Sequence, residues 1–391
     1  MEWRTTAAQG GVGVPGGKPA AQSTAGVAGK AAAVRMVDVL VVSLGATGGL
    51  RAADEELLAS LRRAGATAAI VSPKPPPPPR TLMLTDLRWA RATRQAVQAE
   101  LARARPRALI YSTTTSALLW PRPGAIRFDA PAAGNRRGRH GLWQRPLERR
   151  RLREAPLLLP QSAGALLETP ATVRRSIDPD RELVLPVPVE PSGVRDRETA
   201  RGTPAPLAER AGTPLPERDI AAITYAANPA KKGLDRVLDA WRRVRRPGEE
   251  LLVAGVEEDR LRGLGYAVPA EGVRVTGMLA PADYRALLRR ARVYICAARR
   301  EDHGIAQLEA LADGCMLVTT LSPGPYVALP IARELDGRLV DEDLVSALRM
   351  ALDDPAPGYA ERASRALAPL RRVEVDRLVA EELLPRLLRR A

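Results

Sequence analysis

The segment REDHGIAQLEALADGC, residues 300–315, carries two glutamates, Glu301 and Glu309, with seven residues between them. The apolar run before it predicts a buried strand, and the small and apolar residues after Gly304 predict a helix. Glu301 then falls in the loop between strand and helix, whereas Glu309 lies more than one turn inside the helix. Two carboxylates placed in this way suit the hydroxyl groups of a sugar and of a ribose, because each charge-assisted hydrogen bond contributes about 1.5–3 kcal/mol.

Two lysines, Lys231 and Lys232, stand between the end of a predicted strand and the start of a predicted helix, with Gly233 at the junction. A lysine at a helix N-terminus opposes the helix macrodipole, and a bound anion removes that conflict. We therefore expect a phosphate group at this position. The alternative is that both lysines are solvated loop residues.

A glycine-bearing loop, SLGATGGLR, follows the first predicted strand. Gly48 and Gly49 remove side chains next to a helix start, so that backbone N–H groups can approach a phosphate. The alternative is that glycine serves only the tight turn from strand to helix. The loop matches neither G-x-x-x-x-G-K-[ST] nor G-x-G-x-x-G, so it is not a Walker loop or a full dinucleotide fingerprint.

Strands and helices alternate twice along the chain, which predicts an α/β protein with two Rossmann-like domains facing each other across a cleft. In such sheets ligands bind beyond the carboxyl ends of the strands. The first domain is expected to include a late strand at ELVLPVPV, residues 182–189. The expected boundaries are a disordered tail at 1–36, a first domain at 37–190, a linker or insertion at 191–218, a second domain at 219–365 and a helix at 366–391 that packs back across the domains.

The chain of 391 residues is long enough for two ordinary domains, and its formal net charge is +15. That charge fits phosphate-bearing small molecules and acidic membrane surfaces. Aromatic residues make up 3% of the chain, which argues against a surface that stacks nucleic-acid bases. No apolar run approaches the roughly 18 residues that a membrane span needs.

Cys296 and Cys315 are the only cysteines. Each lies in an apolar run, which indicates buried thiols in a reducing compartment rather than a disulfide. The chain has only two histidines, too few for a histidine-rich metal site, and no metal is expected. The D-x-D matches at 178–180 and 341–343 are interpreted as turn and surface residues.

Four segments occur in order in the second half of the chain: YAANPAKKGLDRVLDAW, VRVTGMLAPADYRALLRRARVYICAA, EDHGIAQLEALADGCMLVTT and LDGRLVDEDLVSALRMAL. This series resembles the carboxyl-terminal domain of GT-B fold glycosyltransferases, specifically the retaining glycosyltransferase family 4. The resemblance implies a nucleotide-diphosphate sugar as donor substrate and transfer to an acceptor hydroxyl with retention of anomeric configuration. It also implies that no metal or other cofactor takes part, that the first domain lies on the acceptor side, and that the second binds the nucleotide sugar.

The resemblance further implies roles for individual residues. Glu301 matches the first glutamate of the family's paired-glutamate motif, which contacts the donor sugar, and Glu309 matches the second, which holds the ribose. Lys232 matches the lysine that neutralises the diphosphate. The other expected donor-binding residues are Asn228, the loop residues His303, Gly304 and Ile305, and Gly48 and Gly49 of the first domain.

Three positions depart from the family pattern. The family's arginine, five residues before the lysine, is Ala227 here, so Arg299 and Arg300 are candidates to share the charge of the leaving group. Many members have Phe at the position of His303. The family's histidine in the first domain has no clear match, and Asp129 in RFDAP is the candidate for its place.

Two rival functions stay open. A nucleotide-sugar 2-epimerase has the same fold and binds the same donors without an acceptor, and a degenerate domain lacking the arginine would be a non-catalytic binding subunit. We expect a cytoplasmic protein whose partners are a nucleotide sugar and an acceptor that the sequence does not identify, whether glycan, lipid-linked or small molecule. The basic stretch at 136–153 is a candidate for peripheral contact with the anionic inner face of a membrane.

Overall fold

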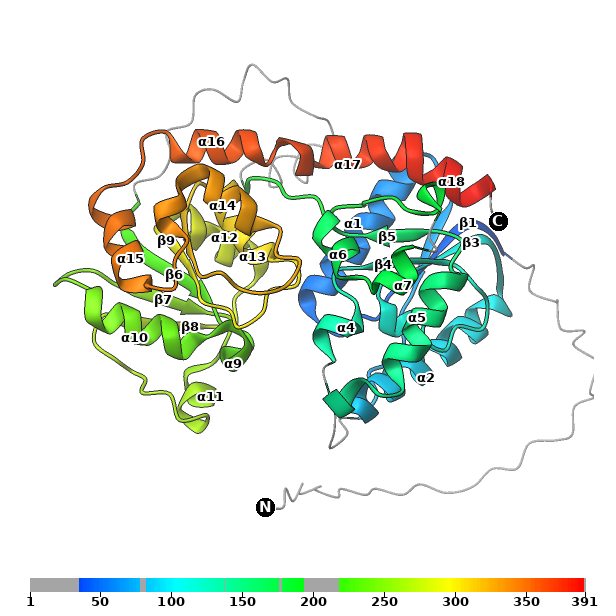
Figure 1. The fold of residues 1–391 in the computed structure, drawn as a ribbon, viewed down its shortest axis with the longest axis horizontal. Helices are drawn as coiled ribbons and strands as arrows, with labels where there is room; N and C mark the ends of the chain where they lie inside the picture. Colours follow the sequence, from blue (N-terminus) through cyan, green and yellow to red (C-terminus); the bar gives the residue numbers. More distant parts are fainter. Residues whose placement is uncertain (1–34, 78–81, 137, 176–177, 193–217, 390–391) are drawn as a thin grey trace, which may run out of the picture. The chain divides into compact units, whose positions relative to one another are not determined.

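The computed structural model describes residues 35–77, 82–136, 138–175, 178–192 and 218–389. The tail expected at 1–36 and the linker expected at 191–218 lie almost entirely outside these ranges. Two five-stranded parallel sheets with flanking helices make up the described part, and they confirm the predicted α/β fold with two Rossmann-like domains (Figure 1). No described helix is long and apolar enough to cross a membrane.

The sheet of the N-terminal domain has the strand order β2-β1-β3-β4-β5, and all of its pairs are parallel. Its strands are β1 (Arg35–Val42), β2 (Ala68–Val71), β3 (Ala104–Tyr111), β4 (Ala125–Phe128) and β5 (Leu158–Pro160). The apolar residues at the ends of β1 and β3 are buried on both faces, as a parallel sheet under helices requires. The helices are α1 (Gly48–Arg63), α2 (Leu82–Leu101), α3 (Thr114–Ala117), α4 (Ala132–Asn135), α5 (Gln144–Glu154), α6 (Ala163–Glu168) and α7 (Ala171–Arg174), with short 3₁₀ turns at Gly138–Gly141 and Pro179–Arg181.

The sheet of the C-terminal domain has the order β10-β9-β6-β7-β8, again parallel throughout. Its strands are β6 (Ile220–Tyr225), β7 (Leu251–Ala254), β8 (Val273–Gly277), β9 (Ala291–Cys296) and β10 (Met316–Thr319). Helices lie on both faces of this sheet (Figure 1). They are α9 (Pro229–Lys232), α10 (Leu234–Val244), α11 (Glu258–Gly263), α12 (Pro281–Arg290), α13 (Ile305–Ala312), α14 (Ala328–Asp336) and α15 (Leu344–Asp353), with a 3₁₀ turn at Gly337–Leu339.

The strand predicted at 182–189 is wrong. This segment runs beside β5, where the N–H groups of Leu183 and Leu185 donate to the carbonyls of Leu158 and Pro160 at 2.9 and 2.8 Å, but it forms only an isolated bridge. The partner strand β5 ends at Pro160, so the ladder stops after these two hydrogen bonds.

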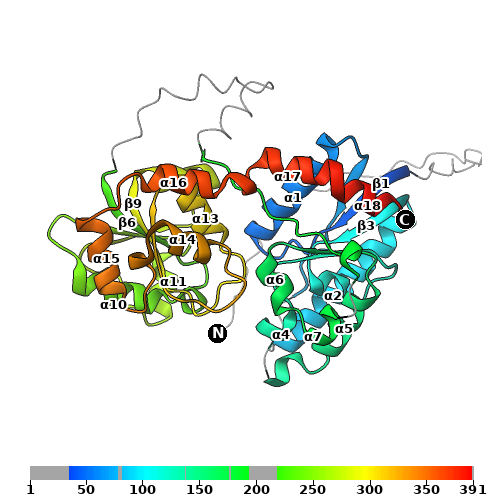
Figure 2. The same ribbon diagram turned by 45° about the horizontal axis from the view of Figure 1, so that its top comes forward.

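The C-terminal segment consists of several short helices rather than one. These are α16 (Tyr359–Ala366), a 3₁₀ turn (Ala368–Leu370), α17 (Arg372–Leu378), a π-helical turn (Val379–Leu383) and α18 (Leu384–Arg389). In α16, Tyr359 and Ala363 belong to the core of the C-terminal domain. The buried face from Val375 to Leu387 belongs to the core of the N-terminal domain, and α17 lies beside α1 in both views (Figures 1 and 2). The last helices thus pack against both cores.

Candidate functional site

The lysine loop and the glutamate loop meet at the carboxyl ends of β6 and β9. Asn228 caps the short helix α9, because its side-chain oxygen accepts from the N–H of Lys231 at 3.1 Å. Gly233 ends α9 with a φ of 65°. A Cβ at this position would collide with the carbonyl oxygen of Ala297, so glycine is what lets the lysine loop approach the segment after β9.

Each lysine of this loop pairs with one carboxylate of the glutamate loop. Lys232 Nζ lies 2.6 Å from Glu301 Oε2, and Lys231 Nζ lies 2.9 Å from Asp302 Oδ2. The side chains of Glu301 and Lys232 are only 7% and 22% exposed, so this pair is largely shielded from water. Lys231 is 43% exposed and its pair is correspondingly screened.

Gln307 of α13 is a second partner of Glu301, and the sequence patterns did not point to it. Its Nε2 donates to Glu301 Oε2 at 3.0 Å and lies 2.9 Å from Cys296 Sγ. Gln307 is 1% exposed. A carboxamide inside an otherwise apolar helix face is the signal that could have identified it, because buried polar groups have hydrogen-bond partners.

Glu309, in the middle of α13, has a different partner. Arg285 of α12 lies 3.3 Å from Glu309 Oε1 and also pairs with Asp313 at 2.5 Å. Glu309 keeps 25% of its side chain exposed and borders a cavity of about 30 Å³ together with Arg285 and Ile305. Arg285 was not predicted as a site residue, since α12 is adjacent to α13 only in the folded chain.

His303, which follows Asp302 in the glutamate loop, is buried. Neither of its ring nitrogens has a hydrogen-bond partner among the described residues. Burial, with a smaller contribution from the nearby Arg127 guanidinium, lowers the pKa of His303 to about 4, so the imidazole is neutral at physiological pH. Gly304 follows with a φ of 85°, and a Cβ there would lie 2.9 Å from the Tyr326 ring. These constraints fix the backbone at the start of α13.

The two predicted glycines of the N-terminal domain open α1. Thr47 caps the helix by accepting from the N–H of Leu50 at 3.3 Å, so Gly48 and Gly49 are its first two residues. The turn itself is made by Gly45, with a φ of 64°. A Cβ at Gly49 would meet nothing within 4 Å. Packing within the described chain therefore gives no reason for glycine at this position, which leaves room for an approaching ligand.

Asp129 follows β4 and accepts from the N–H of Ala130 at 2.8 Å. Burial raises its pKa, and the carboxylate of Asp302 raises it further. Two residues earlier, Arg127 pairs with Asp54 at 3.4 Å, and Ser43 donates to Asp54 at 2.6 Å. This network links α1, which carries Asp54, to β4, which carries Arg127.

Arg299 and Arg300 both have carboxylate partners. Arg299 pairs with Asp235 at 2.6 Å and is 51% exposed. Arg300 pairs with Asp302 at 2.8 Å and with Glu168 of α6 at 2.5 Å, and it donates to Asn135. Either arginine would have to exchange a partner in order to meet a phosphate.

The two D-x-D matches are local caps. Asp178 accepts from the N–H of Asp180 at 3.0 Å, and Asp341 accepts from the N–H of Asp343 at 2.8 Å. This agrees with their interpretation as turn and surface residues. Cys296 and Cys315 are free and buried, as predicted.

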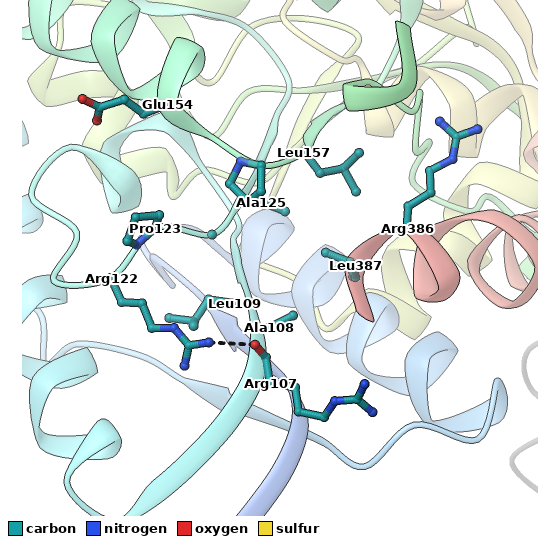
Figure 3. A pocket seen from close by; sticks show the side chains of 12 residues that line it. Arg107, Ala108, Leu109, Arg122, Pro123, Ala125, Glu154, Leu157, Arg386 and Leu387 are labelled. Carbon is teal, nitrogen blue, oxygen red and sulfur yellow. Dashed lines mark hydrogen bonds between the residues drawn. The ribbon is translucent and has the colours of Figure 1, made fainter. Parts of the chain in front are cut away.

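A larger cavity, of about 280 Å³, lies at the N-terminal ends of β4 and β5, next to α18 (Figure 3). Arg107, Arg122 and Arg386 border it, and Arg122 donates to the carbonyl of Arg107 at 2.7 Å. This is the edge of the sheet opposite to the strand ends that carry the glycine loop and Asp129. The size of this cavity therefore does not make it the candidate site.

Residues 218–354 match the family model described as "Glycosyl transferases group 1". No curated protein matches the chain. Among solved structures, sucrose-phosphate synthase from Thermosynechococcus elongatus is 14% identical with a TM-score of 0.66, covering 91% of this chain and 100% of that one.

Two further structures have the same fold. WaaG, a glycosyltransferase involved in lipopolysaccharide biosynthesis, is 16% identical with a TM-score of 0.59, covering 88% of this chain and 99% of that one. HepE of Anabaena, in complex with UDP and glucose, is 14% identical with a TM-score of 0.56, covering 89% and 99%. The chain therefore has the GT-B fold, and its residues 218–354 match a group 1 glycosyl transferase domain that contains Lys232, Glu301 and Glu309.

Proposed function

We propose that the protein transfers a sugar from a nucleotide-diphosphate donor to an acceptor hydroxyl, with retention of anomeric configuration and without a metal ion. The observation that carries the proposal is the contact of Lys232 with Glu301 at 2.6 Å, inside the segment that matches the group 1 glycosyl transferases. A cation for phosphate and a carboxylate for sugar hydroxyls stand side by side at the carboxyl edge of the sheet, where α/β folds bind nucleotides.

In this proposal each residue meets one part of the donor. Glu309 accepts from the ribose hydroxyls, Lys232 neutralises the diphosphate, and Glu301 accepts from a hydroxyl of the transferred sugar. The N–H groups of His303, Gly304 and Ile305 are available near the start of α13. Gly48 and Gly49 let the backbone of the other domain approach the diphosphate.

Transfer forms a bond between the acceptor oxygen and C1 of the sugar and breaks the bond between C1 and the β-phosphate oxygen. The departing phosphate receives the acceptor proton, so that no protein base is required. The protein contributes orientation and stabilisation of the negative charge that develops on the leaving diphosphate. Because position 227 is alanine, Lys232 carries most of that stabilisation, and Arg299 or Arg300 contributes only after leaving its carboxylate.

A nucleotide-sugar 2-epimerase is the second candidate. The neutral form of Asp129, favoured by its raised pKa, would suit an acid in the cleft, and a putative UDP-N-acetylglucosamine 2-epimerase from Listeria monocytogenes shares the fold with a TM-score of 0.52 and 14% identity. An epimerase would alter the donor without any acceptor. This difference separates the two functions experimentally.

Peripheral membrane contact is part of the same proposal. Leu142 is 65% exposed and lies two residues before the start of α5, on which Arg149 and Arg153 are also exposed. An exposed apolar residue beside cationic side chains suits an anionic bilayer surface. Co-sedimentation with phosphatidylglycerol vesicles but not with phosphatidylcholine vesicles, lost in Arg149→Glu/Arg153→Glu, would support it.

The direct test is a screen of UDP-, ADP- and GDP-sugars by thermal shift, followed by mass spectrometry of the reaction with mixed glycan and lipid-linked acceptors. We expect one nucleotide series to raise Tm and one donor to yield a glycosylated acceptor. Lys232→Ala should abolish most of this transfer. Binding without any transfer would instead support the non-catalytic subunit.

A further inference from the structure

The charge of Lys232 is already neutralised inside the protein. Its ammonium lies 2.6 Å from Glu301 Oε2, and both side chains are mostly buried. A diphosphate that takes Lys232 as its counter-ion therefore competes with Glu301 for the same cation. It also brings a second negative charge close to the carboxylate, in a place where water screens little.

The cost of that competition depends on what else Glu301 contacts. Besides Lys232, its described partner is the Nε2 of Gln307 at 3.0 Å, on the same oxygen. Gln307 is 1% exposed and neutral, and it also lies against Cys296 Sγ. If Lys232 turned to a phosphate, Glu301 would keep one neutral donor while 7% exposed, and a buried carboxylate that loses its cation is destabilised.

A sugar hydroxyl can replace what Glu301 loses, but a nucleoside diphosphate has no such group to offer. We propose that Glu301 makes the site discriminate between the intact nucleotide sugar and the free nucleoside diphosphate. By holding Lys232, Glu301 lowers the affinity for the free diphosphate. The intact nucleotide sugar avoids this penalty, because its sugar hydroxyl donates to Glu301 in place of the lysine. This inference rests on the proposed function. It gives Glu301 a role in specificity beyond that of a sugar contact.

The same competition acts after transfer. Once the sugar has moved to the acceptor, the remaining diphosphate no longer supplies a hydroxyl to Glu301. The carboxylate then regains Lys232, and the diphosphate loses its cation. Release of the product is favoured by a contact that belongs to the protein itself.

The neighbouring pair provides a matched control. Lys231 and Asp302 lie in the same two loops at 2.9 Å, but Lys231 is 43% exposed. Asp302→Asn removes one negative charge next to Glu301 without removing the partner of Lys232, and Arg300, which also pairs with Asp302, keeps its second carboxylate partner, Glu168. Any gain in diphosphate affinity that merely reflects less negative charge in the loop should appear in Asp302→Asn as well.

The test is calorimetric titration without acceptor, using UDP and UDP-glucose, ADP and ADP-glucose, and GDP and GDP-mannose. In Glu301→Gln we expect one nucleoside diphosphate to bind about tenfold tighter than in the wild type, while the matching nucleotide sugar binds no tighter or more weakly. Asp302→Asn should change the diphosphate affinity less than threefold. Glu301→Ala serves as a second variant, and thermal unfolding shows whether each variant is folded.

The inference is overturned if Glu301→Gln and Glu301→Ala leave the diphosphate affinity unchanged or lower it, if Asp302→Asn gives the same gain, or if no diphosphate binds to any form. If the wild-type protein transfers sugar and Glu301→Gln has an unchanged affinity for the diphosphate, the inference is rejected and the proposed function stands. Tighter diphosphate binding in Glu301→Gln, together with no transfer by the wild-type protein to any acceptor, would support the inference and reject the proposed function.

Discussion

The two sheets of this protein share one plan, five parallel strands with helices on both faces, yet their carboxyl ends carry charge in different ways. In the C-terminal domain Lys232 and Glu309 keep 22% and 25% of their side chains exposed. In the N-terminal domain Arg127 and Asp54 are 2% and 1% exposed. Charges that stay near the surface can exchange a protein partner for a ligand, whereas a fully enclosed pair serves the fold.

Desolvation explains the difference. Burial lowers the pKa of Arg127 and raises the pKa of Asp54. The charge of Asp54 acts in the opposite direction on Arg127, and the charge of Arg127 does so on Asp54. Removing one partner would leave the other buried without compensation. We therefore expect substitutions in the buried network to change stability most, and substitutions in the lysine and glutamate loops to change ligand binding most.

The largest effect is expected in the buried pair. Arg127→Met should lower the free energy of unfolding by about 3–5 kcal/mol, because Asp54 loses its cation in an enclosed position. Urea denaturation at neutral pH measures this. The double variant Arg127→Met/Asp54→Asn should recover part of the loss, and a single variant as stable as the wild type would contradict the structural role of the pair.

A pH-dependent effect is expected from Glu148 of α5, which is 2% exposed and accepts from the N–H of Ala132 at 2.8 Å. Burial is the main cause that raises its pKa from 4.5 to about 7, against the opposing effects of Thr114, Ala132 and Arg136. The folded state then binds the proton more tightly than the unfolded state. Its contribution to stability is complete below pH 4.5 and is lost as the pH rises to about 7, by on the order of 3 kcal/mol.

Glu148→Gln should reduce this pH-dependent decrease in the free energy of unfolding. Urea unfolding of the wild type and the variant at pH 5 and pH 8 gives the comparison. We expect the difference in stability between the two pH values to shrink in the variant, while its affinity for nucleotides stays the same. An equal pH dependence in both proteins would contradict the raised pKa.

The next effect is on binding. Lys232→Ala should weaken UDP, or whichever nucleoside diphosphate binds, by about thirtyfold, or ~2 kcal/mol, and leave the corresponding nucleoside unaffected. Calorimetric titration of the nucleoside and of the nucleoside diphosphate measures the two changes in affinity. Lys231→Ala is the control. Because Lys231 is more exposed than Lys232, this variant should lose less affinity for the diphosphate. Equal losses for nucleoside and diphosphate would mean that Lys232 supports the loop rather than a phosphate.

The smallest effect is expected at Glu309. Glu309→Gln should weaken nucleoside and nucleoside diphosphate alike, by about tenfold, because the ribose is common to both and Arg285 already shares the charge of Glu309. Titration of the same ligand pair tests it. A loss of affinity for the diphosphate alone would indicate that Glu309 acts on the phosphates and not on the ribose.

Periodicity and turn residues were enough to predict both parallel sheets, since apolar strands and helix faces are local properties of the sequence. The predicted strand at 182–189 was wrong because its partner β5 is only three residues long and ends at Pro160, which the apolar pattern of 182–189 does not reveal. Gln307 and Arg285 were missed for a different reason. Their importance depends on which carboxylate each one touches, and those contacts join α12, α13 and the loop after β9, which no single sequence window contains.

The motif resemblance named Lys232 and Glu301 but did not predict that they pair with each other. That contact depends on the close approach of Gly233 to Ala297, a feature of the tertiary structure. The roles of Asp129, Arg299 and Arg300 likewise depend on partners in distant segments. For these residues, sequence supplies the candidates and the folded chain supplies their electrostatic environment.

The most direct test of sugar transfer by the paired loops is proton NMR of the sugar C1 position while the enzyme, the binding nucleotide sugar and an acceptor react. We predict that the donor signal is consumed only when the acceptor is present, that the new glycosidic C1 proton has the donor's anomeric configuration, and that Lys232→Ala shows neither change. An acceptor-independent appearance of the C2 epimer of the donor, or a product of inverted configuration, would contradict this function.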